Sequence, residues 1–122
     1  MANYIDRRYG PRGLHATSLH PGGIWTPLQK HIAPETPAGW KSAPGVNNGI
    51  KSTEQGAATT VWAAVASEWE GKGGKNLEDC QVAPQIKENA TPQDKGHAKH
   101  AYNPEGEEQL WKDSEGMVGL GV

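Results

Sequence analysis

The feature that most constrains the fold is a proline followed by two glycines, at Pro21, Gly22 and Gly23. Six residues that could form a short strand, 14–19, come directly before it. Pro-Gly-Gly is typical of a turn, so we expect the chain to reverse there. The two glycines also leave no side chain that would keep a ligand away from the backbone. The sequence therefore predicts a short strand that ends in a turn able to approach a bound molecule closely.

Two helices are indicated in the first half of the chain. Residues 2–9 have apolar side chains at helical spacing, and Gly10 and Pro11 then end the helix. A second helix begins at Ser52, the first residue of an S-x-x-Q capping box. It closes at Gly71. Its apolar residues recur on one face, which we expect to be buried: Ala58, Val61, Trp62, Val65 and Trp69.

The second half predicts one strand and one helix. Residues 75–79 form the strand, anchored by Leu77. A proline at the first helical position and acidic residues in the first turn indicate a helix over 103–119. The segments 21–52 and 82–102 are expected to be loops. The buried face of the last helix is expected to consist of Leu110, Trp111, Met117 and Val118.

The order helix, strand, loop, helix, strand, helix predicts an α/β fold. A helix between two strands favours a right-handed crossover that places the strands side by side and parallel. Two parallel strands are not a stable sheet, and the first of them would leave an unpaired edge.

The composition predicts a small hydrophobic core. Only 17 of the 122 residues are Leu, Ile, Val or Phe, whereas Gly and Pro together number 25. Ordering glycine-rich loops costs conformational entropy and returns little buried apolar area. We therefore expect the isolated chain to be marginally stable.

The charge balance argues against several classes of partner. The net charge is −2, which gives no reason to expect a nucleic acid or an anionic membrane. No apolar run approaches the roughly 20 residues that span a bilayer, and the first residues do not read as a signal peptide. The single cysteine, Cys80, fits a reducing compartment. We expect a cytoplasmic protein.

The turn and the segments after it resemble the short-chain dehydrogenase/reductase family. The family pattern P-G-x-[VI]-x-T matches at Pro21, Gly22, Ile24 and Thr26. The run Glu-Gln-Gly-Ala-Ala at 54–58, the Gly-Gly-Lys at 73–75 and the helix at 103–119 follow in the family's order. The retinol-dehydrogenase-like branch is the most similar, with Thr in place of the usual Pro at position 53.

This resemblance implies the C-terminal half of a Rossmann-like, doubly wound parallel sheet, with residues 1–122 as a single partial domain. It implies an oxidoreductase that uses NAD or NADP to interconvert an alcohol and a carbonyl on a small, apolar substrate. Pro21, Gly22, Ile24 and Thr26 would lie beside the nicotinamide, with the Ile24 backbone at its carboxamide and Thr26 at the carboxamide or the pyrophosphate. Residues 27–52 would be the substrate loop. Trp25 and Trp40 would either contact the substrate or pack the loop.

Two motifs of the family are absent from the chain. There is no G-x-x-x-G-x-G fingerprint, because Lys51 stands where Gly45 and Gly49 would require a third glycine. There is no catalytic Y-x-x-x-K either, since Tyr4 is followed at that spacing by Arg8 and falls downstream of the true motif. We therefore expect a truncated chain with no catalytic residue, which binds no cofactor alone.

Two functions remain open. The chain could supply one half of an enzyme whose other half lies outside it. It could also be a non-catalytic protein that self-associates or binds a partner such as a full-length relative.

Histidine and cysteine add no site. His97 and His100 form the only closely spaced histidine pair, in a polar loop without a second ligand pair, so no metal site is expected. Cys80 lacks a neighbouring base, and we expect a buried or inert thiol.

Overall fold

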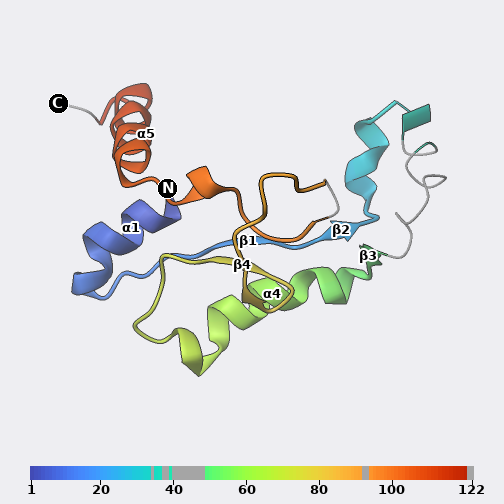
Figure 1. The fold of residues 1–122 in the computed structure, drawn as a ribbon, viewed down its shortest axis with the longest axis horizontal. Helices are drawn as coiled ribbons and strands as arrows, with labels where there is room; N and C mark the ends of the chain where they lie inside the picture. The colour runs from blue at the N-terminus through green and yellow to red at the C-terminus, as the bar shows by residue number, and fades with distance from the viewer. Residues whose placement is uncertain (34, 37–38, 40–48, 92–93, 121–122) are drawn as a thin grey trace.

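The structure is a computed structural model that describes residues 1–33, 35–36, 39, 49–91 and 94–120. Its strands form a three-stranded sheet of order β1-β4-β5 and a separate pair, β2-β3. Figure 1 shows the helices around these short sheets. The elements are α1 (Ala2–Tyr9), β1 (Ser18–His20), β2 (Gly23–Ile24), β3 (Ile50–Lys51), α4 (Thr53–Val65), β4 (Asn76–Glu78), β5 (Gln81–Val82) and α5 (Pro104–Met117).

The strands β1 and β4 confirm the expected α/β fold with parallel neighbours. They pair in parallel with Leu19 opposite Leu77, and Leu77 is completely buried. The prediction of a strand over 14–19 was too long at its start, because residues 14–17 lie outside any strand. Within the described residues, β1 has β4 as its only strand neighbour, so its other edge is open as expected.

The expected chain reversal after β1 was wrong. Gly22 does adopt a left-handed backbone, with φ of +89°, but the chain then continues outward into β2 (Figure 1). There β2 pairs in parallel with β3, and not with β1. The Pro-Gly-Gly sequence therefore bends the chain from one sheet into a second one.

A hairpin between β4 and β5 was not predicted. Its two central residues, Asp79 and Cys80, have φ of 52° and 55°, which is the conformation of a type I′ turn. Asp is one of the residues that favour this turn, but the second central position normally holds glycine and here holds Cys80, so the strongest hairpin signal is absent from the sequence.

The helix α4 begins where the capping box placed it. The Ser52 hydroxyl accepts a hydrogen bond from the Gln55 amide at 3.2 Å, and the Gln55 side chain accepts one from the Ser52 amide at 2.9 Å. The α-helix ends at Val65, and a short 3-10 helix, Ser67–Trp69, follows before Gly71.

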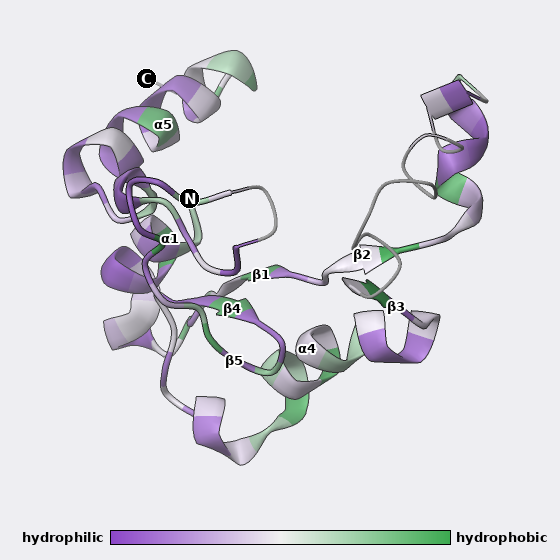
Figure 2. Cartoon of the chain, turned by 45° about the vertical axis from the view of Figure 1, so that its right-hand side comes forward, coloured by the Kyte–Doolittle hydropathy of each residue, from purple (hydrophilic) through white to green (hydrophobic). Residues whose placement is uncertain are grey.

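The buried face of α4 differs from the expected one. Val61 and Val65 are 56% and 76% exposed, whereas Gly56 and Thr59 are buried. The helix lies against the strands, and small residues permit that close approach. A Cβ at Gly56 would lie 2.6 Å from the Ile24 Cδ1 atom. Figure 2 colours several residues of α4 green, which marks them as hydrophobic.

The helix α5 was predicted correctly, but its apolar face was not. Asn103 caps its start by accepting the Gly106 amide hydrogen at 3.2 Å. Only Trp111 of the expected face packs, stacking on Tyr4 of α1 with ring centroids 4.9 Å apart. The remaining members of that face are exposed, Leu110 at 47%, Met117 at 85% and Val118 at 68%.

The core is as small as the composition suggested. Among the described residues, the buried hydrophobic side chains are Tyr4, Leu77 and Ala83. No helix in the described part of the chain is long and apolar enough to cross a membrane.

Candidate functional site

A groove of about 630 Å³ lies at the carboxyl ends of the parallel strands. The last residues of β1, β3 and β4, which are His20, Lys51 and Glu78, all line it. Gly22 and Gly23 of the turn line one side, and the segment 94–96 lines another. Ligands of parallel α/β sheets bind at this edge, so the groove is the candidate site.

The turn is fixed by two polar contacts. The Gly22 amide donates a hydrogen bond to His20 Nδ1 at 3.2 Å, and Lys51 Nζ donates one to the Pro21 carbonyl oxygen at 3.1 Å. Gly22 is required for two reasons, its positive φ and the closeness of Lys51. A Cβ at Gly22 would lie 2.8 Å from Lys51 Cε.

Two lysines hold one carboxylate at the edge of the groove. Asp79 accepts hydrogen bonds from both Lys51 and Lys95. The Lys51 hydrogen bond, followed by that of Lys95, holds the pKa of Asp79 below its ordinary value. Asp79 in turn raises the pKa of Lys95. The neighbouring Glu78, the last residue of β4, accepts the Gly96 amide hydrogen at 2.8 Å. The adjacent acids Glu78 and Asp79 therefore both hold the 94–96 segment.

Ile24 lies away from the groove. Its side chain packs on Gly56 of α4, and its carbonyl oxygen accepts a hydrogen bond from Gln29 Nε2 at 3.0 Å. Gly22 therefore lines the groove, Pro21 is joined to the groove residue Lys51 through its carbonyl oxygen, and the Ile24 side chain packs against α4.

Thr26 caps a 3-10 helix, Pro27–His31, that the sequence analysis missed. Its Oγ1 accepts the Leu28 amide hydrogen at 3.3 Å, and its own amide donates to Gln29 Oε1 at 2.8 Å. The signal was available, because Thr26 and Gln29 form the same T/S-x-x-Q pattern as the box at Ser52. Of the two candidate substrate-loop residues, Trp25 is half-buried, and Trp40 lies outside the described residues.

The cluster of Lys51, Asp79 and Lys95 was also missed. These residues are 28 and 16 positions apart along the chain, and no local pattern connects them. Of the two alternatives expected for Cys80, a buried or an inert thiol, the buried one is wrong, since Cys80 is exposed. Its amide donates to Thr59 Oγ1 at 3.1 Å, which joins the hairpin to α4. Over the described ranges, no group of three or more His, Cys, Asp or Glu side chains could hold a metal ion.

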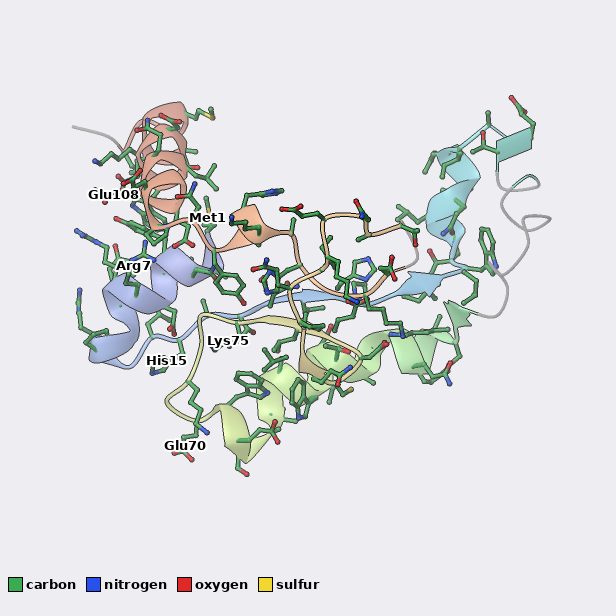
Figure 3. All side chains as sticks on the ribbon, in the orientation of Figure 1. Met1, Arg7, His15, Glu70, Lys75 and Glu108 are labelled. Atoms are coloured by element: carbon green, nitrogen blue, oxygen red, sulfur yellow. The ribbon has the colours of Figure 1, made fainter. Side chains whose placement is uncertain are left out.

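A second polar pair lies at the opposite end of the sheet. His15 Nδ1 is 2.9 Å from Asp6 Oδ1, and a Cβ at Gly73 would lie 2.2 Å from that same oxygen. Figure 3 labels His15 below α1 and Lys75 near the start of β4, both far from β2. This pair joins α1 to the segment before β1, lies beside Gly73 of the loop before β4, and takes no part in the groove.

Fold and site together define an α/β protein with a glycine turn at the carboxyl edge of a parallel sheet. No protein-family model matches the chain. It is 52% identical over 120 residues to a short-chain dehydrogenase/reductase of Penicillium roqueforti, covering 98% of this chain and 35% of that relative. It is 43% identical over 125 residues to an oxidoreductase of Penicillium decumbens, covering 98% of this chain and 36% of the relative. A probable oxidoreductase of Streptomyces lividans is 36% identical to the chain over 111 residues. The match covers 87% of this chain and 37% of that relative.

The chain therefore belongs to the short-chain dehydrogenase/reductase family, which confirms the resemblance found in the sequence. It spans about a third of the length of the curated relatives it matches.

Proposed function

We propose that this chain supplies the cofactor-side turn and the substrate loop of an NAD- or NADP-dependent oxidoreductase. The enzyme would interconvert an alcohol and a carbonyl on a small, apolar substrate. The observation that carries the proposal is the Pro21–Gly23 turn at the carboxyl end of β1, in a chain that matches oxidoreductases over almost its whole length. We further propose a cytoplasmic location, based on the single cysteine.

The turn fits a flat, neutral ring. Gly23 is exposed at the groove and has no side chain of its own, so a nicotinamide could approach its backbone between the neighbouring side chains of Ile50 and Lys51. Thr26 Oγ1 accepts hydrogen bonds from the amides of Leu28 and Gln29, and its hydroxyl donates to Gln29 Oε1 at 3.3 Å. These contacts hold the Thr26 side chain at the start of the 3-10 helix, and Thr26 would exchange one of them for a contact with the carboxamide or the pyrophosphate. When bound, the nicotinamide accepts or delivers the hydride.

The proposed acid/base chemistry lies outside this chain. The Y-x-x-x-K pattern of the family is absent from its sequence, and the candidate groove acid, Asp79, is committed to two lysines. These residues would therefore bind and orient, and they would not transfer a proton. The sequence of the turn's flank and of the proposed substrate loop contains two tryptophans, Trp25 and Trp40, and their apolar rings favour an apolar substrate.

A second candidate is a non-catalytic protein that binds a full-length relative or a second copy of itself. One observation favours it. Apolar side chains are exposed on two helices, Val65 at 76% on α4 and Met117 at 85% on α5. Exposed apolar faces of this kind are often covered by a protein partner.

The mass and the activity of the native protein distinguish the two candidate functions. An antibody against residues 103–118 would be used to measure its mass in source cells and to capture it. The enzyme proposal expects a polypeptide larger than 13.1 kDa that reduces NAD or NADP when an apolar alcohol is added. A 13.1 kDa polypeptide without that reaction would overturn the enzyme proposal and favour the second candidate.

A further inference from the structure

We propose that Lys51 is a positioning residue, which holds the Pro21–Gly23 turn in the shape that receives the cofactor. Its importance for cofactor binding rests on the proposed function. The contacts that hold the turn are observed in the structure and do not depend on the proposed function.

Lys51 contacts the turn in two ways. Its ammonium donates a hydrogen bond to the Pro21 carbonyl oxygen at 3.1 Å. Its stem fills the space beside Gly22, because a Cβ there would lie 2.8 to 2.9 Å from the last carbons of the lysine. Lys51, the last residue of β3, thus covers Gly22 in the turn that follows β1. Both the backbone acceptor and the open side of the glycine are occupied by one side chain.

Asp79 fixes the position of the Lys51 ammonium. The carboxylate accepts a hydrogen bond from Lys51 and lies at the end of β4, which pairs with β1. The Lys51 side chain is only 20% exposed, so little of its stem can reorient in solvent. A free surface lysine would lose conformational entropy on holding the turn, whereas one already held by a carboxylate loses less. Through Pro21 and Asp79, Lys51 therefore joins the end of β3 to the residues that follow β1 and β4.

Lys95 differs from Lys51 although both bind the same carboxylate. Its side chain is 63% exposed, and its hydrogen bond goes to Asp79 and not to the turn. Removal of Lys95 would leave the hydrogen bond from Lys51 to Pro21 in place. Substituting the two lysines one at a time therefore separates the effect of losing the turn contact from the effect of losing a positive charge beside Asp79.

The suitable enzyme is a chimera, the Penicillium roqueforti relative in which this chain replaces the matched 120 residues. Its NADH and NADPH dissociation constants would be measured by nicotinamide fluorescence for Lys51→Met, Lys51→Arg and Lys95→Met. Lys112→Met, an exposed lysine paired with Glu108 on α5, is the matched control. Hydrogen exchange of the peptide spanning residues 19–24 reports on the turn itself, and melting temperatures report on folding.

We expect Lys51→Met to weaken cofactor binding about tenfold, the effect of one charge-assisted hydrogen bond. The turn peptide should exchange faster, and the melting temperature should change little. Lys51→Arg should recover most of the affinity, because a guanidinium can donate to both the Pro21 oxygen and Asp79. Lys95→Met should have a smaller effect than Lys51→Met, and Lys112→Met none.

Equal effects of Lys51→Met and Lys95→Met, or an unchanged turn peptide in Lys51→Met, would overturn the positioning role. If Lys51→Met lowers the melting temperature strongly, its loss of affinity could come from unfolding, and Lys51→Arg then provides the test. A stable Lys51→Arg variant that fails to recover the cofactor affinity also overturns the positioning role. A folded chimera that binds no cofactor would instead refute the proposed function. The exchange of the turn peptide would still decide whether Lys51 holds the turn.

Discussion

The ammonium of Lys51 lies 3.1 Å from the carbonyl oxygen of Pro21 and donates a hydrogen bond to it. This contact joins the end of β3 to the turn after β1, two segments about 30 residues apart. The geometry of the turn is therefore set by a long-range contact as well as by its glycines. The substitutions below are made in the chimera, whose larger fold we expect to give a measurable unfolding transition.

Gly22→Ala should destabilise the chimera more than Gly13→Ala. Both glycines have a positive φ, +89° and +86°, which costs an alanine about 1 kcal/mol. Only at Gly22 would the new methyl group also displace Lys51 from Pro21, since nothing lies within 4 Å of a Cβ at Gly13. We expect an excess of about 1 kcal/mol, measured by urea unfolding. The excess should vanish in a Lys51→Ala background, and its persistence there would contradict the contact.

Gly56→Ala should destabilise the chimera despite the better helix propensity of alanine. The methyl group would meet Ile24 Cδ1 at 2.6 Å in a buried contact, and overpacking of this kind costs about 1–3 kcal/mol. Gly116→Ala in α5 is the control, because nothing lies within 4 Å of its Cβ. There alanine should be neutral or stabilise by about 0.5 kcal/mol. Stabilisation by Gly56→Ala would show that α4 does not pack on Ile24.

The contribution of Asp79 to stability should disappear in acid. Lys51 and then Lys95 lower its pKa below 3.8, so the folded state favours the ionised carboxylate. A depressed pKa adds stability above the unfolded-state pKa, and this stability is lost as the pH falls through the folded-state value. The difference in unfolding free energy between wild type and Asp79→Asn should be constant above about pH 5 and shrink below about pH 4. A difference that persists to lower pH would contradict the ion pairs.

Glu107→Gln should loosen the contact between α1 and α5. Burial raises the pKa of Glu107, but hydrogen bonds from Arg7 at 2.6 Å and Asn3 at 3.2 Å outweigh it, so the pKa is lowered. Arg7 is nearly half exposed, so solvent screening limits the loss to about 1–2 kcal/mol. Glu108→Gln, which affects only an exposed pair with Lys112, should cause no measurable change. Equal effects of the two substitutions on the hydrogen exchange of α5 would contradict this role.

The isolated 122-residue chain should melt with low cooperativity or self-associate. Its described core contains few buried hydrophobic side chains, and large apolar residues on α4 and α5 are exposed. Calorimetry and light scattering test this directly. A sharp two-state transition from a monodisperse monomer would show that the chain has a better core than its composition suggests.

Local signals in the sequence predicted the elements whose ends have their own chemistry. The capping box at Ser52 and the Asn103-Pro104 start placed two helices, and Leu77 marked the centre of β4. Hydrophobic periodicity, by contrast, identified an apolar face on α4 but not the buried one. The strands select small residues such as Gly56 and Thr59 for close approach, which a search for large apolar residues overlooks.

The candidate site was predicted only in part. Gly22 lines the groove, because the strand that precedes it sets its place at the sheet edge, and the role of the turn residues at a cofactor stays a prediction. The residues that fix them, Lys51 and Asp79, come from other strands, and pairing between distant segments has no local signature. Asp79 also depends on a hairpin turn without glycine, which turn statistics would not indicate.

The most direct test of the account is a titration of the chimera with NADH and NADPH, followed by nicotinamide fluorescence. We expect saturable binding in the micromolar range, and a marked loss of affinity in Gly22→Val but not in Gly13→Val. We also expect no binding by the isolated chain. A chimera that folds and melts like the relative but binds neither cofactor, while the relative binds one, would contradict the claim that this turn faces the nicotinamide.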